Sequence, residues 1–352
     1  MFKVLPAVAT LLLAAGCGPS TKPDAEYQRE IVTGMHQSIL TEIKDLKAAV
    51  TDLQTAAPLP AGRGWDKTMD AAALQNMRAA WTRARTSYEH IEGAVAPLFP
   101  DLDVAADERY EKFIEKLAPT GDQNLFDGTG CTGMHAVERV LFADVTPQSV
   151  LDAEKVRPGY KAAAFPATAQ EAADFKNLLV ARLLTDVDEL EKSWTPAKID
   201  LPAAYQGLKD LMNELREKVN KASAGVEESR YAQVTMTDIR NNLQGTKSIY
   251  ALFRPWLLTK KSKKDANHDG DKVDAKLAAA FDRLEASFAE FPAAAIPAPP
   301  ATWSAEMPSP ADLQTPFGKL YTAVRTATDP KVEASIVDEM NDASVLLGFP
   351  EE

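Results

Sequence analysis

Apolar residues recur every three or four positions along most of this sequence, and that spacing limits the fold more than any other feature. Between residue 27 and about residue 54 the recurring positions are Ile31, Met35, Ile39, Ile43, Leu46 and Val50. In an α-helix these side chains form one apolar stripe, which is stable when it is buried against another element. The sequence has no sustained apolar–polar alternation and no hairpin turn between β-branched runs, so strands are not expected. The chain is therefore predicted to be all-α, built as elongated helical bundles.

The same period predicts eight further helices, separated by breaks rich in proline and glycine. They cover about residues 71–98, 103–117, 132–142, 169–194, 205–223, 234–258, 274–288 and 329–347. A faint repeat relates residues 81–98 to residues 243–257, because each segment is a long helix whose late aromatic residue is followed by a proline. We predict two related four-helix-type bundles, residues 27–196 and 197–352, with a boundary near 196–202.

The first 17 residues have the layout of a secretory signal. A positive charge at Lys3 precedes an apolar stretch over residues 4–15, which is too short to span a bilayer. Cys17 directly after Ala-Gly resembles a bacterial lipobox, which implies a signal peptide over 1–16, a lipidated Cys17 and a tether over 17–26. The lipid would hold the chain on the periplasmic side of the bacterial envelope, and Gly18 slightly favours the outer membrane. The alternative is an ordinary cleaved signal in which the cysteine is incidental.

The charge of the chain restricts its partners. Asp and Glu number 51 against 39 Lys and Arg, for a net charge of −12. Nucleic acid is not expected as a partner because phosphate binding needs a basic surface, whereas binding of cations is compatible with this charge. The only cysteines are Cys17 and Cys131. If Cys17 carries lipid, no disulfide forms and stability must come from packing.

Two pairs of residues have the spacing of metal ligands. His135 and Glu138 lie three positions apart on a predicted helix, so they share a face from which both could coordinate one metal ion. Glu89 and Glu92 also share a face, and a hard cation such as Fe(III), Ca(II) or Mn(II) would relieve their mutual repulsion. The alternatives are a packed histidine beside a solvated Glu138, and a solvated acidic patch at Glu89 and Glu92.

Two further features are weaker signals for metal. Cys131, four positions before His135, would favour Cu or Zn as a third ligand, although a small buried residue at a loop-to-helix junction explains it as well. Residues 265–271 imitate the start of an EF-hand loop, but its twelfth position is Lys276 in place of the bidentate glutamate. Weak or absent calcium binding is therefore expected there.

Three blocks occur in an order that resembles the EfeO/EfeM family of periplasmic iron-uptake proteins, whose domain is imelysin-like and peptidase-named. They are Tyr88-Glu89-His90-Ile91-Glu92, residues 99–103 (Phe-Pro-Asp-Leu-Asp) and residues 132–138 (Thr-Gly-Met-His-Ala-Val-Glu). Residues 227–231 and 237–255 are similar to the family's later block. Gly93 stands where the family has proline, Met134 replaces an aromatic residue, and the spacing to the third aspartate is one residue longer. The chain resembles the shorter form of the family, with no cupredoxin-like domain before the bundle.

The resemblance implies an all-α domain of helical bundles that binds metal for iron acquisition. The family's metal-binding residues fall on His135, Glu138, Glu89, Glu92, Glu214 and Asp107. The metal implied is iron, with Zn or Cu as alternatives, and the partners implied are the membrane and an iron-uptake permease or a peroxidase-like protein.

Three functions are open at this point. The leading one is a metal-binding component of iron uptake without catalysis, since the candidate ligands are mostly hard carboxylates. The second is a metal-dependent peptidase of the imelysin-like class, although the chain has no His-Glu-x-x-His and only four histidines. The third is a module that binds a polysaccharide or a protein partner through a bridging metal.

Overall fold

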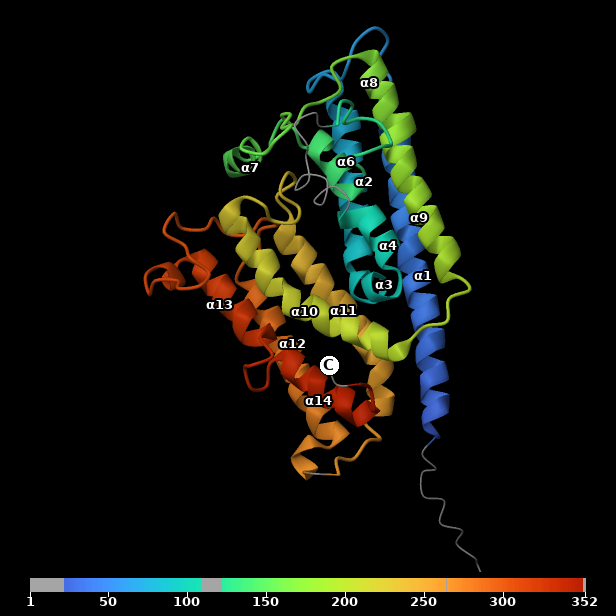
Figure 1. The fold of residues 1–352 in the computed structure, drawn as a ribbon, viewed down its shortest axis with the longest axis vertical. Helices are drawn as coiled ribbons and strands as arrows, with labels where there is room; N and C mark the ends of the chain where they lie inside the picture. Colours follow the sequence, from blue (N-terminus) through green and yellow to red (C-terminus); the bar gives the residue numbers. More distant parts are fainter. Residues whose placement is uncertain (1–21, 109–121, 264, 351–352) are drawn as a thin grey trace, which may run out of the picture.

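The computed structural model describes residues 22–108, 122–263 and 265–350, and every regular element in these ranges is helical, as predicted (Figure 1). In chain order the α-helices are α1 (Asp24–Ala56), α2 (Ala71–Glu89), α3 (Glu92–Leu98), α4 (Pro100–Asp103), α6 (Met134–Leu141), α7 (Gln148–Glu154), α8 (Ala169–Asp174), α9 (Val180–Trp194), α10 (Leu201–Lys221), α11 (Thr235–Leu257), α12 (Gly270–Ala289), α13 (Pro316–Thr328) and α14 (Ile336–Leu347). Among the described helices, none combines the length and the apolar character needed to cross a membrane. The predicted signal peptide and Cys17 lie outside the described residues.

Helix α1 is the longest element and forms the predicted stripe. All six apolar positions listed for it above are buried. The helix begins at Asp24 rather than Tyr27, because Pro23 is readily accommodated just before a helix and acidic side chains favour its first turn. Its long axis runs along α2 and α9, and it also packs on α11 (Figure 1).

The buried apolar side chains form two clusters. One joins the C-terminal half of α1 to α2, α6, α8 and the start of α9, and includes Trp81 and Phe175. The other joins the N-terminal half of α1 to α3, the end of α9 and helices α10 to α14. Helices α1 and α9 therefore contribute to both clusters, with Ile31 and Trp194 packed among the later helices. The division into bundles 27–196 and 197–352 stays a prediction.

The predicted helix over 71–98 is interrupted. Helix α2 ends at Glu89 and α3 begins at Glu92, with His90 and Ile91 between them. Helix α11 crosses at this break: a Cβ on Gly245 would lie 2.2 Å from the carbonyl oxygen of His90. After α4 the chain forms a π-helical turn, Val104–Glu108 (η1). The rest of the helix predicted over 103–117 lies outside the described residues.

The helix predicted over 329–347 begins only at Ile336, as α14, and residues 329–335 are not helical. Helix α13, Pro316–Thr328, was not predicted. Thr315 and Ser335 cap the two helices by accepting hydrogen bonds from Gly318 N and Asp338 N, and Pro330 cannot donate to a continuous helical ladder. Helix α7 was not predicted. Helix α10 begins four residues early because Asp200 caps it, and a π-helical turn, Phe175–Leu179, separates α8 from α9.

Candidate metal centre

A buried group of ionisable side chains lies where α2, α3, η1, α6, α10 and α11 converge. Gly133 lies on one side of this group and must be glycine for two reasons. Its φ is 93°, and a Cβ at this position would lie 2.9 Å from the carbonyl oxygen of Ala106 in η1. The start of α6 therefore lies directly against η1. This contact places His135 of α6 beside Asp107 of η1.

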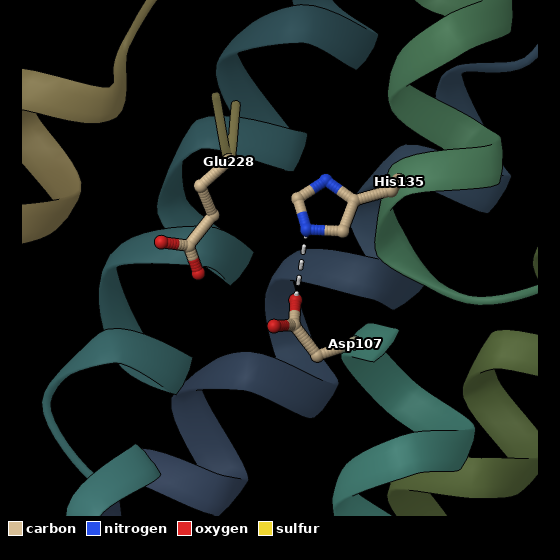
Figure 2. Close-up of side chains that lie close together, drawn as sticks. All are labelled: Asp107, His135 and Glu228. Atoms are coloured by element: carbon tan, nitrogen blue, oxygen red, sulfur yellow. Dashed lines mark ion pairs between the residues drawn. The ribbon is translucent and has the colours of Figure 1, made fainter. Parts of the chain in front are cut away.

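Asp107, His135 and Glu228 form the first triad of the centre (Figure 2). Each offers one donor atom, and these atoms lie within 4.8 Å of one another. His135 Nε2 lies 3.3 Å from Asp107 Oδ1, and Glu228, from the segment between α10 and α11, brings one carboxylate oxygen within 4.8 Å of the donor atoms of both. The three residues are buried, with exposed fractions of 3% for His135, 5% for Asp107 and 8% for Glu228. Two carboxylates and an imidazole that converge away from water are suited to hold a metal ion.

Glu138 holds the imidazole of His135 from behind. Its Oε2 is 2.8 Å from His135 Nδ1, and its Oε1 accepts hydrogen bonds from the backbone N–H groups of Tyr231, at 2.9 Å, and Ala232, at 2.8 Å. Both carboxylate oxygens are thus already engaged. With Nδ1 donating to Glu138, the other ring nitrogen, Nε2, is directed at Asp107, as in the carboxylate–histidine–metal arrangement.

Glu89, Glu92 and Glu228 form a second triad, whose donor atoms also lie within 4.8 Å of one another. Glu228 therefore belongs to both triads. The break between α2 and α3 keeps Glu89 and Glu92 together, as their spacing predicted. Asn242 of α11 donates to this triad through Nδ2, at 2.5 Å from Glu89 Oε2 and 2.9 Å from Glu92 Oε2.

Two permanent cations are buried in the centre. Arg85 is 1% exposed and makes ion pairs with Glu89, with Asp107 and, at 2.5 Å, with Glu228. Lys218, from α10, lies 3.0 Å from Glu92 and 2.9 Å from Glu228. Neither cation was predicted as part of the site.

Carboxylates outnumber the cations that face them. The positive groups of the centre are Arg85, Lys218 and the imidazole of His135. Six carboxylates surround them, those of Glu89, Glu92, Asp107, Glu138, Glu228 and Asp238. Burial raises the pKa of Asp238 to about 7, although Arg85 opposes the shift. Burial likewise raises the pKa of Glu89 well above its usual range, against the charges of Arg85 and Lys218. Without a further cation, the centre accommodates its excess negative charge only by keeping protons on buried acids.

His135 and Asp107 form a tightly coupled pair. Burial alone would lower the pKa of His135, but the charge and hydrogen bond of Asp107, with a further hydrogen bond to Glu138, raise it to about 10. Burial works against ionised Asp107, yet Arg85 and His135 hold the pKa of Asp107 below its usual range. A metal ion at His135 Nε2 would therefore have to displace a proton at neutral pH.

Five of the six predicted ligands meet in the centre: Glu89, Glu92, Asp107, His135 and Glu138. Glu214 lies one helical turn before Lys218 and belongs to neither triad of the described residues; burial raises its pKa to about 7. Cys131 is buried beside α6, and its sulfur joins neither triad of the part of the chain that the structure describes. Burial raises the pKa of the Cys131 thiol well above its usual range.

The site residues that were not predicted from the sequence fall into two groups. One group comes from the second half of the chain, and the other carries positive charge. Glu228, Asp238 and Asn242 fall within the later blocks of the family resemblance but carried no ligand spacing of their own. Arg85 and Lys218 carried a different signal, since each interrupts the apolar stripe of its helix with a charge.

The fold and the centre together define an α-helical domain of the imelysin class. The sequence model of the imelysin family matches residues 32–328, and the chain belongs to that family. An imelysin-like protein from Psychrobacter arcticum, whose crystal structure is known at 2.15 Å, has the same fold with a TM-score of 0.58. The superposition covers 93% of this chain and 98% of that one, at 14% sequence identity.

Relatives in the EfeO group are more similar in sequence. An Efem/EfeO family lipoprotein of Staphylococcus haemolyticus is 27% identical over 281 residues, which is 77% of this chain and 84% of the relative. The iron uptake system component EfeO of Yersinia pestis is 28% identical over 253 residues, which is 70% of this chain. The chain spans about half the length of the EfeO relatives that it matches, with 52% covered in Yersinia pestis and 48% in Escherichia coli K12. The EfeO names describe iron-uptake components and the Staphylococcus name describes a lipoprotein, whereas the family model carries a peptidase name.

Proposed function

We propose that this chain is an extracytoplasmic lipoprotein that binds iron as a component of iron uptake, with Asp107, His135 and Glu228 as the ligands of the metal. The observation that carries the proposal is the buried convergence of their three donor atoms within 4.8 Å. An excess of carboxylates around them favours an added cation. Two hard carboxylates per imidazole favour iron over Zn or Cu.

Glu138 has a different role in this proposal from the one its spacing suggested. It orients the ring of His135 and leaves Nε2 for the metal, because its own oxygens are engaged by Nδ1 and by two backbone N–H groups. Glu89 and Glu92 flank the metal through the shared residue Glu228. Glu214 lies farther out and lines a surface pocket of about 500 Å³ with Asn213 and Glu217.

The cellular setting of the proposal rests on the relatives and on the first 17 residues. A lipid on Cys17 would hold the domain at a membrane, where an iron-uptake permease or a peroxidase-like partner would exchange iron with it. The similarity to a lipoprotein and to iron-uptake components supports this setting. The peptidase alternative is supported by the family name alone.

The test is metal binding by the mature domain in equilibrium dialysis, with Fe(III) supplied as its nitrilotriacetate complex and with Mn(II), Zn(II) and Cu(II) compared. His135→Ala and Asp107→Asn should weaken binding by more than the ~10–100-fold that loss of an outer-sphere partner costs. His268→Ala is the matched control, because His268 is half-buried at the surface and pairs with Asp265 and Asp342 away from the centre. Equal affinity of wild type and His135→Ala would refute the assignment. Hydrolysis of peptides that depends on His135 and stops on chelation would favour the peptidase.

A further inference from the structure

Lys218 reaches into the second triad from α10 with its side chain almost fully buried. Its Nζ lies 3.0 Å from Glu92 Oε2, 2.9 Å from Glu228 Oε2 and 3.8 Å from Glu89 Oε2. It also donates to Asn242 Oδ1 at 3.1 Å. The ammonium therefore contacts all three carboxylates of the triad and the amide oxygen beside them.

The surroundings of Lys218 are those of a hard-cation site. Three carboxylates and an amide oxygen are the donors that Mn(II), Ca(II) and Mg(II) prefer. Two of the buried carboxylate oxygens accept no hydrogen bond and have ionic partners instead: Arg85 for Glu89 Oε1, and Lys218 for Glu228 Oε2 at 2.9 Å. Lys218, together with Arg85, thus supplies the positive charge that a metal ion would otherwise bring.

The first triad differs in this respect. Lys218 reaches it only through the shared Glu228, and Arg85 pairs with Asp107 and Glu228. Its imidazole, His135, is itself a metal-ligand side chain. The second triad offers carboxylates only, and the ammonium of Lys218 already lies in contact with all three of them.

We propose that Lys218 is a built-in counter-ion that occupies the Glu89–Glu92–Glu228 triad, so that the chain holds one metal ion rather than two. Removal of the lysine charge opens the triad to a second, hard divalent cation. The second ion shares Glu228 with the first. The count of one ion in the wild type rests on the proposed function, whereas the opening of the second triad does not.

The experiment counts bound Mn(II) per chain in the wild type and in Lys218→Met. We expect one ion in the wild type and two in the variant. Because Glu228 would bridge the pair, the two Mn(II) ions should show a magnetically coupled EPR spectrum in place of the isolated-ion signal. Lys218→Gln is the second variant in case methionine prevents folding, since its amide can still donate to the carboxylates, and it too should bind two ions.

Two control variants separate charge from shape. Lys218→Arg keeps the positive charge and should bind one ion. Lys218→Met combined with Glu92→Gln loses the lysine and one carboxylate together, so the charge balance is kept, and it should also bind one ion. Circular dichroism confirms that each protein counted is helical.

The outcomes separate this inference from the proposed function. One ion in both folded Lys218 variants, or two ions in the wild type, would overturn the role of Lys218 and leave the first site standing. No ion in the wild type would refute the proposed site. In that case, one ion bound by Lys218→Met and still bound by the double variant Lys218→Met/His135→Ala would support the role of Lys218. If Lys218→Met bound no ion either, both proposals would be refuted.

Discussion

Glu138 offers the sharpest test of how the centre is built, because two substitutions at this position should fail in different ways. In Glu138→Ala, the backbone N–H groups of Tyr231 and Ala232 and the Nδ1–H of His135 lose their acceptor. A buried donor without a partner costs about 1–3 kcal/mol. Since Ala232 is half-buried, we expect a loss of about 3–6 kcal/mol in the free energy of unfolding. That is a large part of the ~5–15 kcal/mol typical of a domain.

Glu138→Gln should keep the fold and lose the metal. The amide oxygen can still accept from Tyr231 N and Ala232 N, which turns the amide NH₂ group toward His135 Nδ1. Two donors cannot face each other, so Nδ1 gives up its proton and accepts from the amide, while Nε2 keeps its own proton. A metal ion at Nε2 would force that proton back onto Nδ1, against the amide NH₂ group, and we expect affinity for metal to fall about 10–100-fold.

Three measurements check this reasoning. Urea unfolding gives the stability of each variant, calorimetry gives the affinity for metal, and ¹⁵N NMR of the imidazole shows which nitrogens carry protons. At neutral pH without metal, His135 should carry two protons in the wild type and only the Nε2 proton in Glu138→Gln. An unchanged affinity in Glu138→Gln would refute the positioning role. Lost affinity with an unchanged protonation pattern would instead show that Glu138 is itself a ligand.

Three further predictions follow from the same contacts. Burial raises the pKa of Asp238 to about 7, above the ~3.9 of an unfolded chain, so the metal-free protein should lose stability as pH rises from about 4 to 7, by up to about 4 kcal/mol. Asp238→Asn should flatten that pH dependence of the urea midpoint, and an unchanged slope would contradict it. Gly245→Ala should destabilise the fold by about 1–3 kcal/mol because its Cβ would collide with the His90 carbonyl; a melting temperature equal to wild type would argue against that contact. The Cys131 thiol should react with a thiol reagent only after denaturation, since burial raises its pKa and excludes the reagent; rapid labelling of the native protein would show that the loop-to-helix junction opens.

The helical period predicts most of the fold because the apolar stripes are long and regular. It fails where a helix ends without a change in hydrophobicity. The break at His90 and Ile91 lies inside a continuous apolar pattern and is visible only as the close crossing of Gly245. At the other end of the chain, the helix predicted from residue 329 begins only after its cap at Ser335, and the short helix α13, which Thr315 caps, was not predicted.

The candidate site was predictable only in part, for a similar reason. Spacing along one helix places His135 next to Glu138, and Glu89 and Glu92 stay together although one ends α2 and the other begins α3. Spacing carries no information on which helices meet, so the contribution of Glu228 from the second half could not be derived. Lys218 follows Leu215 and Leu211 at the helical period, on the buried face of α10. A lysine at such a position is more often read as solvated, and only the carboxylates opposite it explain its burial.

Helix α1 has a consequence for the order in which the molecule can be built. Its N-terminal half is the first described segment to be synthesised, yet Ile31, Met35 and Ile39 pack among helices that begin after residue 200. Asp24, at its first turn, accepts a hydrogen bond from Trp256 Nε1 at 2.8 Å and pairs with Lys260 at 2.5 Å. Contacts this distant in sequence form late, because a long loop must close first. The first described helix to leave the ribosome is therefore completed among the last, and a chain truncated before α10 would lack the later helices that pack on the N-terminal half of its apolar stripe.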